Sequence, residues 1–373
     1  LGLIPLLPPF INTPAAKAGH ATEVEVNKSM AGVPPDAPAV KYHVLLPTEY
    51  SPDHTYPMVM ALHAIERNPA WELRWWGGTA EKPLQAQRRG YIVIAPEYLD
   101  AKATKYTYSP QSHYRVRMAL RDAFKRFNID SNRVFLAGHG SGGDAAFDIG
   151  NAHPDLFAGV IPITGQLQNL TIKIWRNGRR IPWYIVSGQL DRDVFEKNAS
   201  LLNRMMIAHY DVVLSEFIGR GYESFYEEIH QLFDWMDLQE RTTVPAEFDM
   251  RTVRPNNNRF FWFKANTLAG IGQTRGQSQP FPVVNVANRA KIISVSVRAG
   301  ADDHTTIAIR SPVRSNTIWL SPDIIDYDIR LKVKLGSRQL FNDFVEPSVE
   351  HILDDLRLRG DRQRVYHTRI DLN

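Results

Sequence analysis

The chain has 373 residues and a formal net charge of +4, with 44 lysines and arginines against 40 aspartates and glutamates. This excess of positive charge is too small to indicate a nucleic-acid partner. The chain has no cysteine, which excludes disulfides, thiolate metal sites and a cysteine nucleophile and leaves the redox compartment open. The length predicts more than one domain.

The first 38 residues are rich in proline and alanine and end in GVPPDAP. Pro5, Pro8 and Pro9 interrupt the apolar start, so this stretch is too short and too broken to span a membrane, and no later stretch is long enough. We predict an N-terminal arm or linker over residues 1–38. The start lacks the methionine and positive region of a signal peptide, which suggests a mature form or a piece of a longer protein.

Strand-like and helix-like segments alternate between residues 39 and 244. The strands are almost continuously apolar, and the segments between them have apolar residues at helical spacing. This alternation predicts an α/β domain, a doubly wound and mostly parallel sheet with helices on both faces. The predicted strands are residues 40–47, 58–64, 91–98, 133–139, 157–165, 181–188 and 211–219, and the predicted helices are residues 79–90, 113–128, 143–153, 194–210 and 223–239.

The pattern changes after residue 244, where helical periodicity gives way to short β-rich runs separated by Asn, Gly, Asp and Pro. This spacing predicts a small all-β domain over residues 245–373, an immunoglobulin-like sandwich with one helix and a closing strand in its tail. The predicted strands are residues 259–266, 281–288, 291–300, 304–311, 317–322 and 328–337.

The stretch VFLAGHGSGG, residues 134–143, predicts a strand that ends in a glycine-rich turn and opens a helix. Together with AHPDLFAGVIPITG and IPWYIVSGQLDRDVF downstream, it resembles the α/β-hydrolase family. The similarity is to bacterial esterases of the feruloyl-esterase, polyhydroxyalkanoate-depolymerase and acyl-peptidase-like branch, and it covers about residues 40–240. The resemblance implies an α/β-hydrolase fold for residues 39–244.

The resemblance also implies three catalytic positions, for a nucleophile, an acid and a histidine base. They match Gly140, Asp191 and Tyr222 in this chain. Gly140 has no side chain to attack a carbonyl, and a tyrosine with an ordinary pKa near ~10 is a poor base at neutral pH. Because a serine hydroxyl needs a base to become a nucleophile, two of the three positions lack the required chemistry. We therefore predict an inactive pseudo-esterase.

A second alignment of the same turn leaves an active serine esterase or acyl-peptidase open. Taking residues 138–142 as the turn places Gly140 at its tip and Ser141 one residue later, where a backbone N–H serves the oxyanion hole. Taking Ser141 as the nucleophile puts His139 two residues earlier, where close packing normally needs glycine. This alternative would use Ser141 with Asp191 and a displaced histidine, His63 or His139.

Several residues are candidates for a ligand pocket near this turn. Ala64 stands where the family has a glycine that supplies an oxyanion donor, and the neighbouring histidines are expected to face the pocket. The tryptophans after them predict either an aromatic wall for a ligand or a lid helix packed on the body. The candidate binding residues are His63, Ala64, His139, Trp75 and Trp76, and Tyr106 and Tyr108 are further residues that could line the cleft.

These observations favour a binding or structural role in a larger extracellular or cell-envelope assembly. The expected partner is a protein, and the residual pocket is expected to suit a small ester-like or glycan ligand. No Walker loop, EF-hand loop, His-Glu-x-x-His motif or zinc-ligand cluster is present, so the sequence predicts no cofactor and no metal.

Overall fold

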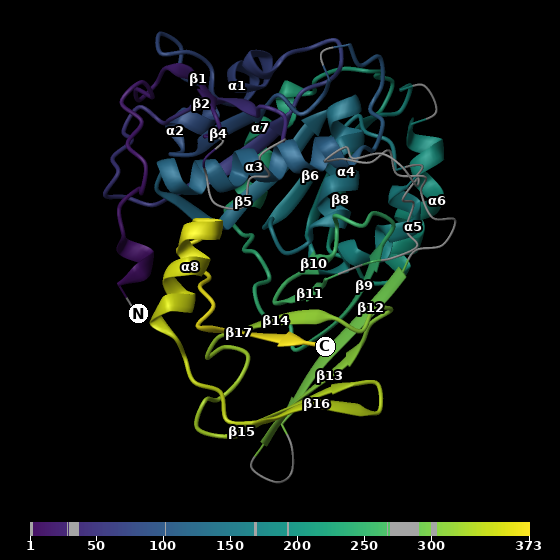
Figure 1. Cartoon of the computed structure of the whole chain (residues 1–373). Helices are drawn as coiled ribbons and strands as arrows, with labels where there is room; N and C mark the ends of the chain where they lie inside the picture. Colours follow the sequence, from purple (N-terminus) through teal and green to yellow (C-terminus); the bar gives the residue numbers. More distant parts are fainter. Residues whose placement is uncertain are drawn as a thin grey trace.

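In the computed structural model we describe residues 3–27, 29, 37–100, 102–167, 170–191, 194–266, 268, 291–299 and 304–373. An eight-stranded sheet forms the larger body, in the order β1-β2-β4-β3-β5-β6-β7-β8 (Figure 1). β2 pairs antiparallel with β1 and β4, and the other neighbouring pairs are parallel. The strands are β1 (Ala21–Glu25), β2 (Lys41–Leu45), β3 (Tyr56–Leu62), β4 (Ile92–Pro96), β5 (Ile129–His139), β6 (Gly159–Ile163), β7 (Trp183–Gly188) and β8 (Val212–Phe217).

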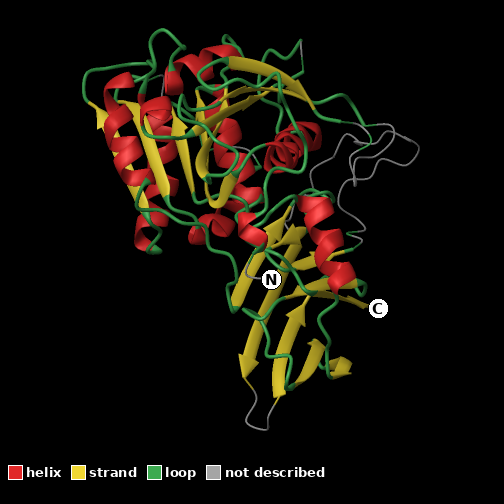
Figure 2. Ribbon diagram, turned by 90° about the vertical axis from the view of Figure 1, so that its left-hand side faces the viewer, coloured by secondary structure: helices red, strands yellow, loops and turns green. Residues whose placement is uncertain are grey.

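Helices cover both faces of this sheet (Figure 2). They are α1 (Pro69–Gly77), α2 (Gln85–Arg88), α3 (Pro110–Arg126), α4 (Ser141–Ala152), α5 (Thr171–Ile174), α6 (Val194–Ile207) and α7 (Ile229–Met236), with short 3-10 turns η1 (Ile4–Leu6), η2 (Trp175–Arg180) and η3 (Tyr226–Glu228). Among the described helices, none combines the length and the apolar character that a bilayer span needs.

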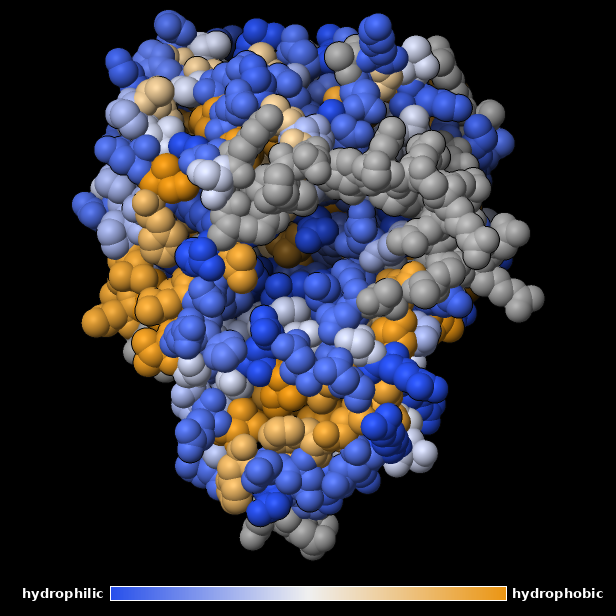
Figure 3. Space-filling view, in the orientation of Figure 1, coloured by the Kyte–Doolittle hydropathy of each residue, from blue (hydrophilic) through white to orange (hydrophobic). Residues whose placement is uncertain are grey.

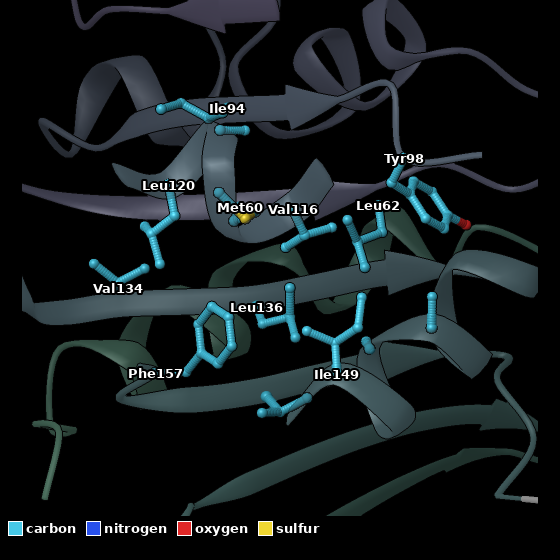
Figure 4. Packing of buried hydrophobic residues seen from close by; sticks show 14 of the residues in the cluster. Met60, Leu62, Ile94, Tyr98, Val116, Leu120, Val134, Leu136, Ile149 and Phe157 are labelled. Carbon is cyan, nitrogen blue, oxygen red and sulfur yellow. The ribbon is translucent and has the colours of Figure 1, made fainter. Parts of the chain in front are cut away.

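Side-chain alternation along the strands produces two cores. Met60 and Leu62 of β3 join a cluster with α3 and α4 on one face, shown in Figure 4. Val59 and Ala61 point to the other face, where they join a cluster with α1 and α7. Since both faces are buried, each central strand is apolar along its length, as the sequence pattern indicated. The predicted α/β-hydrolase fold is confirmed.

Two further sheets form a smaller β domain with a core of its own. The sheets have the orders β10-β11-β14-β17 and β16-β15-β13-β12-β9, and the second contains a parallel pair, β13 and β15. This pair departs from the wholly antiparallel sheets of an immunoglobulin sandwich. The elements are β9 (Glu247–Thr252), β10 (Arg259–Phe260), β11 (Phe263–Ala265), β12 (Lys291–Ala299), β13 (His304–Arg310), β14 (Asn316–Leu320), β15 (Arg330–Leu335), β16 (Arg338–Asp343), α8 (Val349–Arg359) and β17 (Thr368–Leu372).

The structure corrects three sequence predictions. β1 lies in the predicted arm, yet it pairs with β2 along Ala21–Glu25, so residue 38 is not the start of the hydrolase body. The predicted helix over residues 79–90 is reduced to α2, because Pro83 forms a β-bridge with Gly78. β9 and β16 were not predicted, and the strand predicted at residues 281–288 lies outside the described residues.

A buried ion pair joins the two domains. Arg254, just after β9, is fully buried, and its Nη2 lies 2.7 Å from Oδ2 of Asp148 on α4. The Nε of Arg254 donates to the Tyr108 carbonyl at 3.0 Å. Asp148 Oδ2 also accepts from the Tyr106 hydroxyl at 2.8 Å and lies 2.9 Å from Nε2 of His113. The β domain is therefore connected directly to the helix that follows the glycine-rich turn.

We expect this network to make folding stability fall between pH 7 and pH 4.5. Burial, followed by the charge of Arg254, lowers the pKa of His113 to about 4. An unfolded histidine titrates near pH 6.5, so below that pH the unfolded chain binds a proton that the folded chain excludes. Stability is lost as pH falls toward 4, by about 3 kcal/mol from His113 alone. Free energies of urea unfolding at the two pH values measure the effect.

The matched variant for this experiment is His113→Gln, which should reduce the pH dependence, while His153 and His63, whose pKa values burial also lowers, should supply what remains of it. Burial alone would raise the pKa of Asp148, but the charges of Arg254 and His113 and its hydrogen bonds hold that pKa far below its usual range. Its stabilising contribution is therefore lost only below about pH 3.8, outside the tested window. An equal free energy of unfolding at pH 7 and pH 4.5 would contradict the prediction.

Candidate active site at the strand–helix turn

The glycine-rich turn connects β5 to α4, and Gly140 lies at its tip. Gly140 has φ 54° and ψ −118°, a conformation that side-chain-bearing residues rarely adopt. Its N–H is fixed by the Ile163 carbonyl at 2.9 Å and by the Thr164 hydroxyl at 3.1 Å, both at the end of β6. The turn has the strained strand-to-helix geometry of a nucleophile elbow.

The glycines on either side of Gly140 are required by close backbone approaches. A Cβ on Gly138 would overlap the carbonyl of Gly142, and a Cβ on Gly142 would overlap the carbonyl of Leu62. Both positions therefore need glycine, and Gly140 is the residue midway between them. With Ser141 as nucleophile, the close-packed position would be His139, whereas the close approach in the structure is at Gly138.

The turns that carry Asp191 and Tyr222 lie against each other beside the tip. Leu190 N–H donates to the Arg220 carbonyl at 2.8 Å, which ties the turn after β7 to the loop after β8. Tyr222 is 51% exposed, and its hydroxyl donates to the Glu66 carboxylate. A Cβ on Gly140 would overlap that hydroxyl and lie 3.0 Å from the Tyr222 Cζ. The phenol occupies the space that a side chain at position 140 would need.

The surroundings of Tyr222 keep its phenol protonated. Burial, the hydrogen bond to Glu66 and the negative charges of Glu66 and Asp191 raise its pKa well above the usual value, and the charge of Arg67 only partly opposes them. Asp191 itself is 3% exposed. A phenol that remains protonated at neutral pH cannot accept a proton from a nucleophile.

The Ser141 hydroxyl is engaged by the backbone. It accepts a hydrogen bond from the Ile65 N–H at 2.9 Å. The sequence predicted an oxyanion donor at Ala64, whereas the N–H of this loop that reaches the turn is that of Ile65, and it is already bonded to Ser141. His63 Nδ1 donates to the Ala64 carbonyl at 2.9 Å, and His139 Nδ1 lies 3.0 Å from the Glu72 carboxylate. Throughout the described part of the chain, no hydrogen bond joins Ser141 to an imidazole.

The predicted binding residues are core residues instead of pocket walls. Trp76 is fully buried and packs against Phe233 of α7, with ring centroids 5.7 Å apart. Trp75 packs on Trp76 and on His139, which is itself 4% exposed. Burial of α1 against the sheet explains this, since its aromatic side faces the second core. Of the two alternatives for these tryptophans, the structure shows a helix, α1, packed on the body of the domain.

Burial likewise removes His63 and Ala64 from the accessible surface. Ala64 is 1% exposed and His63 is 8% exposed, and burial lowers the pKa of His63. His63 contacts Tyr98, whose hydroxyl donates to the His63 carbonyl at 2.9 Å. Both residues support the loop after β3 from within the fold.

The open cavity beside the elbow has a different lining. Its volume is about 470 Å³, and it combines aromatic, acidic and basic side chains. Tyr106 and Tyr108 were candidates from the sequence, whereas Glu66, Lys105 and Asp144 were missed because no motif distinguishes them. The lining residues are Ile65, Glu66, Thr104, Lys105, Tyr106, Tyr108, Ser141 and Asp144.

One surface cluster has metal-ligating groups. The side chains of Glu23, His43 and Glu97 bring ligand atoms within 4.8 Å of one another. They come from β1, from β2 and from the residue after β4, so the sequence has no motif for them. Glu23 already pairs with Lys41 at 2.8 Å, which lowers the pKa of Glu23. The cluster is an ion-pair network whose charge is partly neutralised.

This domain has the α/β-hydrolase fold. The fold is defined by the strand order, by the single antiparallel strand β2 inside the sheet and by the elbow between β5 and α4. No protein-family model matches the chain, and no curated protein matches its sequence.

Solved structures similar to the chain include esterases. A thermostable esterase is 20% identical with a TM-score of 0.46, over 55% of this chain and 60% of the esterase. The fluorophosphonate-binding serine hydrolase F of Staphylococcus aureus is 15% identical with a TM-score of 0.46, over 59% of this chain and 98% of that hydrolase. A ferulic acid esterase of Anaeromyces mucronatus is 14% identical with a TM-score of 0.44, over 62% of this chain and 94% of that esterase. At such identities and scores, the fold assignment rests on the strand order and the elbow.

Proposed function

We propose that this chain is a non-catalytic protein of α/β-hydrolase fold, a pseudo-esterase that acts by binding or by structural assembly. The observation that carries the proposal is the Tyr222 phenol above Gly140, in the space where a nucleophile would lie. The elbow keeps its geometry without a nucleophile, and the base position holds a protonated phenol donating to Glu66.

The energetics of a catalytic triad support this proposal. Removing the nucleophile or the base of a working triad costs several orders of magnitude in rate, because the two groups act as one unit. Here both positions are changed, while Asp191 and the glycines of the turn are kept. A turn that has the shape of an elbow but no reactive group favours a binding surface over turnover.

The cavity beside the elbow is the proposed binding surface. Tyr106 and Tyr108 offer ring edges, and the exposed Glu66 and Lys105 offer charged hydrogen-bonding groups. This mixture suits a small ester-like molecule or a glycan, whose hydroxyl and carbonyl groups need both donors and acceptors. A protein partner or a larger assembly remains part of the proposal, in keeping with the attached β domain.

We expect the wild-type chain to be inert toward serine-hydrolase reagents. With no activated hydroxyl, it should hydrolyse p-nitrophenyl acetate and butyrate no faster than buffer and should resist a fluorophosphonate label. Rates from absorbance and label stoichiometry from intact mass spectrometry measure this. Ser141→Ala should behave identically.

An active serine hydrolase run in parallel checks both reagents. A fluorophosphonate adduct on Ser141, together with turnover that disappears in Ser141→Ala, would contradict the proposal. It would establish the alternative in which Ser141 is the nucleophile with Asp191 and a displaced histidine.

A further inference from the structure

A second cavity lies where the two domains meet. Its volume is about 220 Å³, and residues from both domains line it. In Figure 3 the surface is hollowed between the larger body and the β domain, and the described residues next to the hollow are mostly hydrophilic. Arginine is the main residue type of the cavity. The arginines that line it are Arg117, Arg121, Arg241, Arg259, Arg359 and Arg364.

Acidic residues in and beside this cavity neutralise only some of these charges. Arg241 pairs with Asp361 at 3.1 Å, and Arg359 pairs with Asp355. The guanidinium groups of Arg117 on α3 and Arg259 on β10 have no hydrogen bond or ion pair among the described residues. Asp155 acts on both only through its charge, and Asp355 acts on Arg259 in the same way.

The guanidinium groups also repel one another in a partly desolvated space. Burial, followed by the charges of Arg117 and Arg259, lowers the pKa of Arg121 to about 10. Burial, followed by the charge of Arg359, lowers the pKa of Arg259 to about 10. A partly buried guanidinium charge with no ion pair, as at Arg117 and Arg259, is unfavourable, so an anion between these groups would relieve a cost that the folded chain carries.

Contacts with the rest of the fold hold the cavity arginines in place, so they cannot simply move apart to reduce their mutual repulsion. Arg259 stacks over the Trp319 ring, with 4.0 Å between its Cζ and the ring centroid, so the indole holds its guanidinium in place. Arg121 Nε donates to the Leu358 carbonyl at 2.9 Å at the end of α8. The arginines are thus held toward the cavity from α3, from β10 and from the end of α8.

The chemistry of the lining selects the ligand. Several guanidinium forks favour an oxyanion with more than one negative charge, because each fork can donate two parallel hydrogen bonds to phosphate oxygens. Leu120, Phe124 and Leu156 add apolar surface beside the arginines. We propose that this interdomain cavity binds a small phosphate monoester, with its phosphate among Arg117, Arg121 and Arg259 and its apolar group against Leu120 and Phe124. This inference is independent of the inactivity proposed for the elbow.

Calorimetric titration of the full chain with phenyl phosphate tests the site. We expect binding of one molecule, with a dissociation constant that rises about tenfold or more in Arg117→Gln and in Arg259→Gln, because each loses a charge-assisted hydrogen bond. Arg204→Gln is the matched control: it removes the same charge from an exposed arginine on α6 and should bind like wild type. Inorganic phosphate should bind more weakly than phenyl phosphate, and benzyl alcohol should not bind.

Each other outcome overturns part or all of the proposal. No binding of millimolar phenyl phosphate to wild type, or equal affinity in wild type and Arg117→Gln, overturns the site. An equal loss of affinity in Arg204→Gln shows a nonspecific charge effect and also overturns it. Equal affinity for inorganic phosphate overturns the role of Leu120 and Phe124. If Arg259→Gln does not fold, Arg117→Lys decides, because it keeps the charge and loses the fork.

Discussion

The double variant Gly140→Ser with Tyr222→His is expected to gain esterase activity, about 100-fold or more above wild type. The serine would stand at the tip of an elbow whose backbone already has the required strain, at φ 54° and ψ −118°. A histidine at position 222 is shorter than tyrosine and would leave room for the serine hydroxyl. Asp191 lies close enough for its charge to act on residue 222, and a general base contributes about 10²–10⁴-fold in rate.

The single variant Gly140→Ser should be both inactive and less stable than wild type. Its Cβ would overlap the Tyr222 hydroxyl, and a non-glycine residue in this conformation costs about 1–3 kcal/mol. Adding Tyr222→His should recover part of that loss, because it removes the overlap. The free energies of unfolding of the two single variants and the double variant measure the coupling.

Hydrolysis of p-nitrophenyl acetate and labelling by a fluorophosphonate measure the gain in activity. Adding Asp191→Asn to the double variant should reduce the new activity by about 100-fold or more, because the acid would no longer orient and stabilise the new histidine. A double variant that folds with a stable core and remains unlabelled would contradict our placement of Gly140, Asp191 and Tyr222 at the three catalytic positions.

Replacing Arg254 by alanine is expected to cost about 3–5 kcal/mol of folding free energy. The substitution leaves the fully buried Asp148 carboxylate without its cationic partner, and breaking one side of a buried pair is strongly destabilising. It also removes the hydrogen bond to the Tyr108 carbonyl. Because the pair connects α4 with the segment after β9, the loss should weaken the junction between the two domains first.

Urea unfolding of Arg254→Ala measures this loss. The matched control is Arg357→Ala, which breaks an exposed pair with Asp354 and should change the free energy of unfolding by less than about 1 kcal/mol. Replacing both Arg254 and Asp148 by leucine should recover part of the stability, since no charge is then left buried alone. An Arg254→Ala chain as stable as the Arg357→Ala chain would show that the pair contributes little.

Elements with strong local patterns could be predicted from the sequence. The central strands β3 to β7 are apolar because both faces of the sheet are buried there, and α3, α4, α6 and α7 have apolar residues at helical spacing. The glycine spacing around Gly140 is also a local signal, because close backbone approaches at Gly138 and Gly142 leave no room for a Cβ. β1 escaped prediction because an edge strand alternates polar with apolar residues and buries little.

The candidate site depended on contacts between segments far apart in sequence. Glu66 and Tyr222 are 156 residues apart in the sequence, and no local pattern predicts the hydrogen bond between them. Trp75 and Trp76 are compatible with a pocket wall or a core, and only the packing of α1 against α7 decides between them. Lys105 and Asp144 likewise line the cavity beside the elbow only because the folded chain brings their segments together.

The sequence by itself determined the alternation of strands and helices and the glycine-rich elbow, because these depend on side-chain periodicity and on glycine's lack of a Cβ. Only the tertiary structure decided that the Tyr222 phenol fills the space above Gly140, that Arg254 is buried against Asp148, and that arginines from both domains converge on one cavity. The burial and the charged neighbours of these side chains come from distant parts of the chain. The free energy that each group adds or costs therefore depends on contacts that the local sequence does not specify.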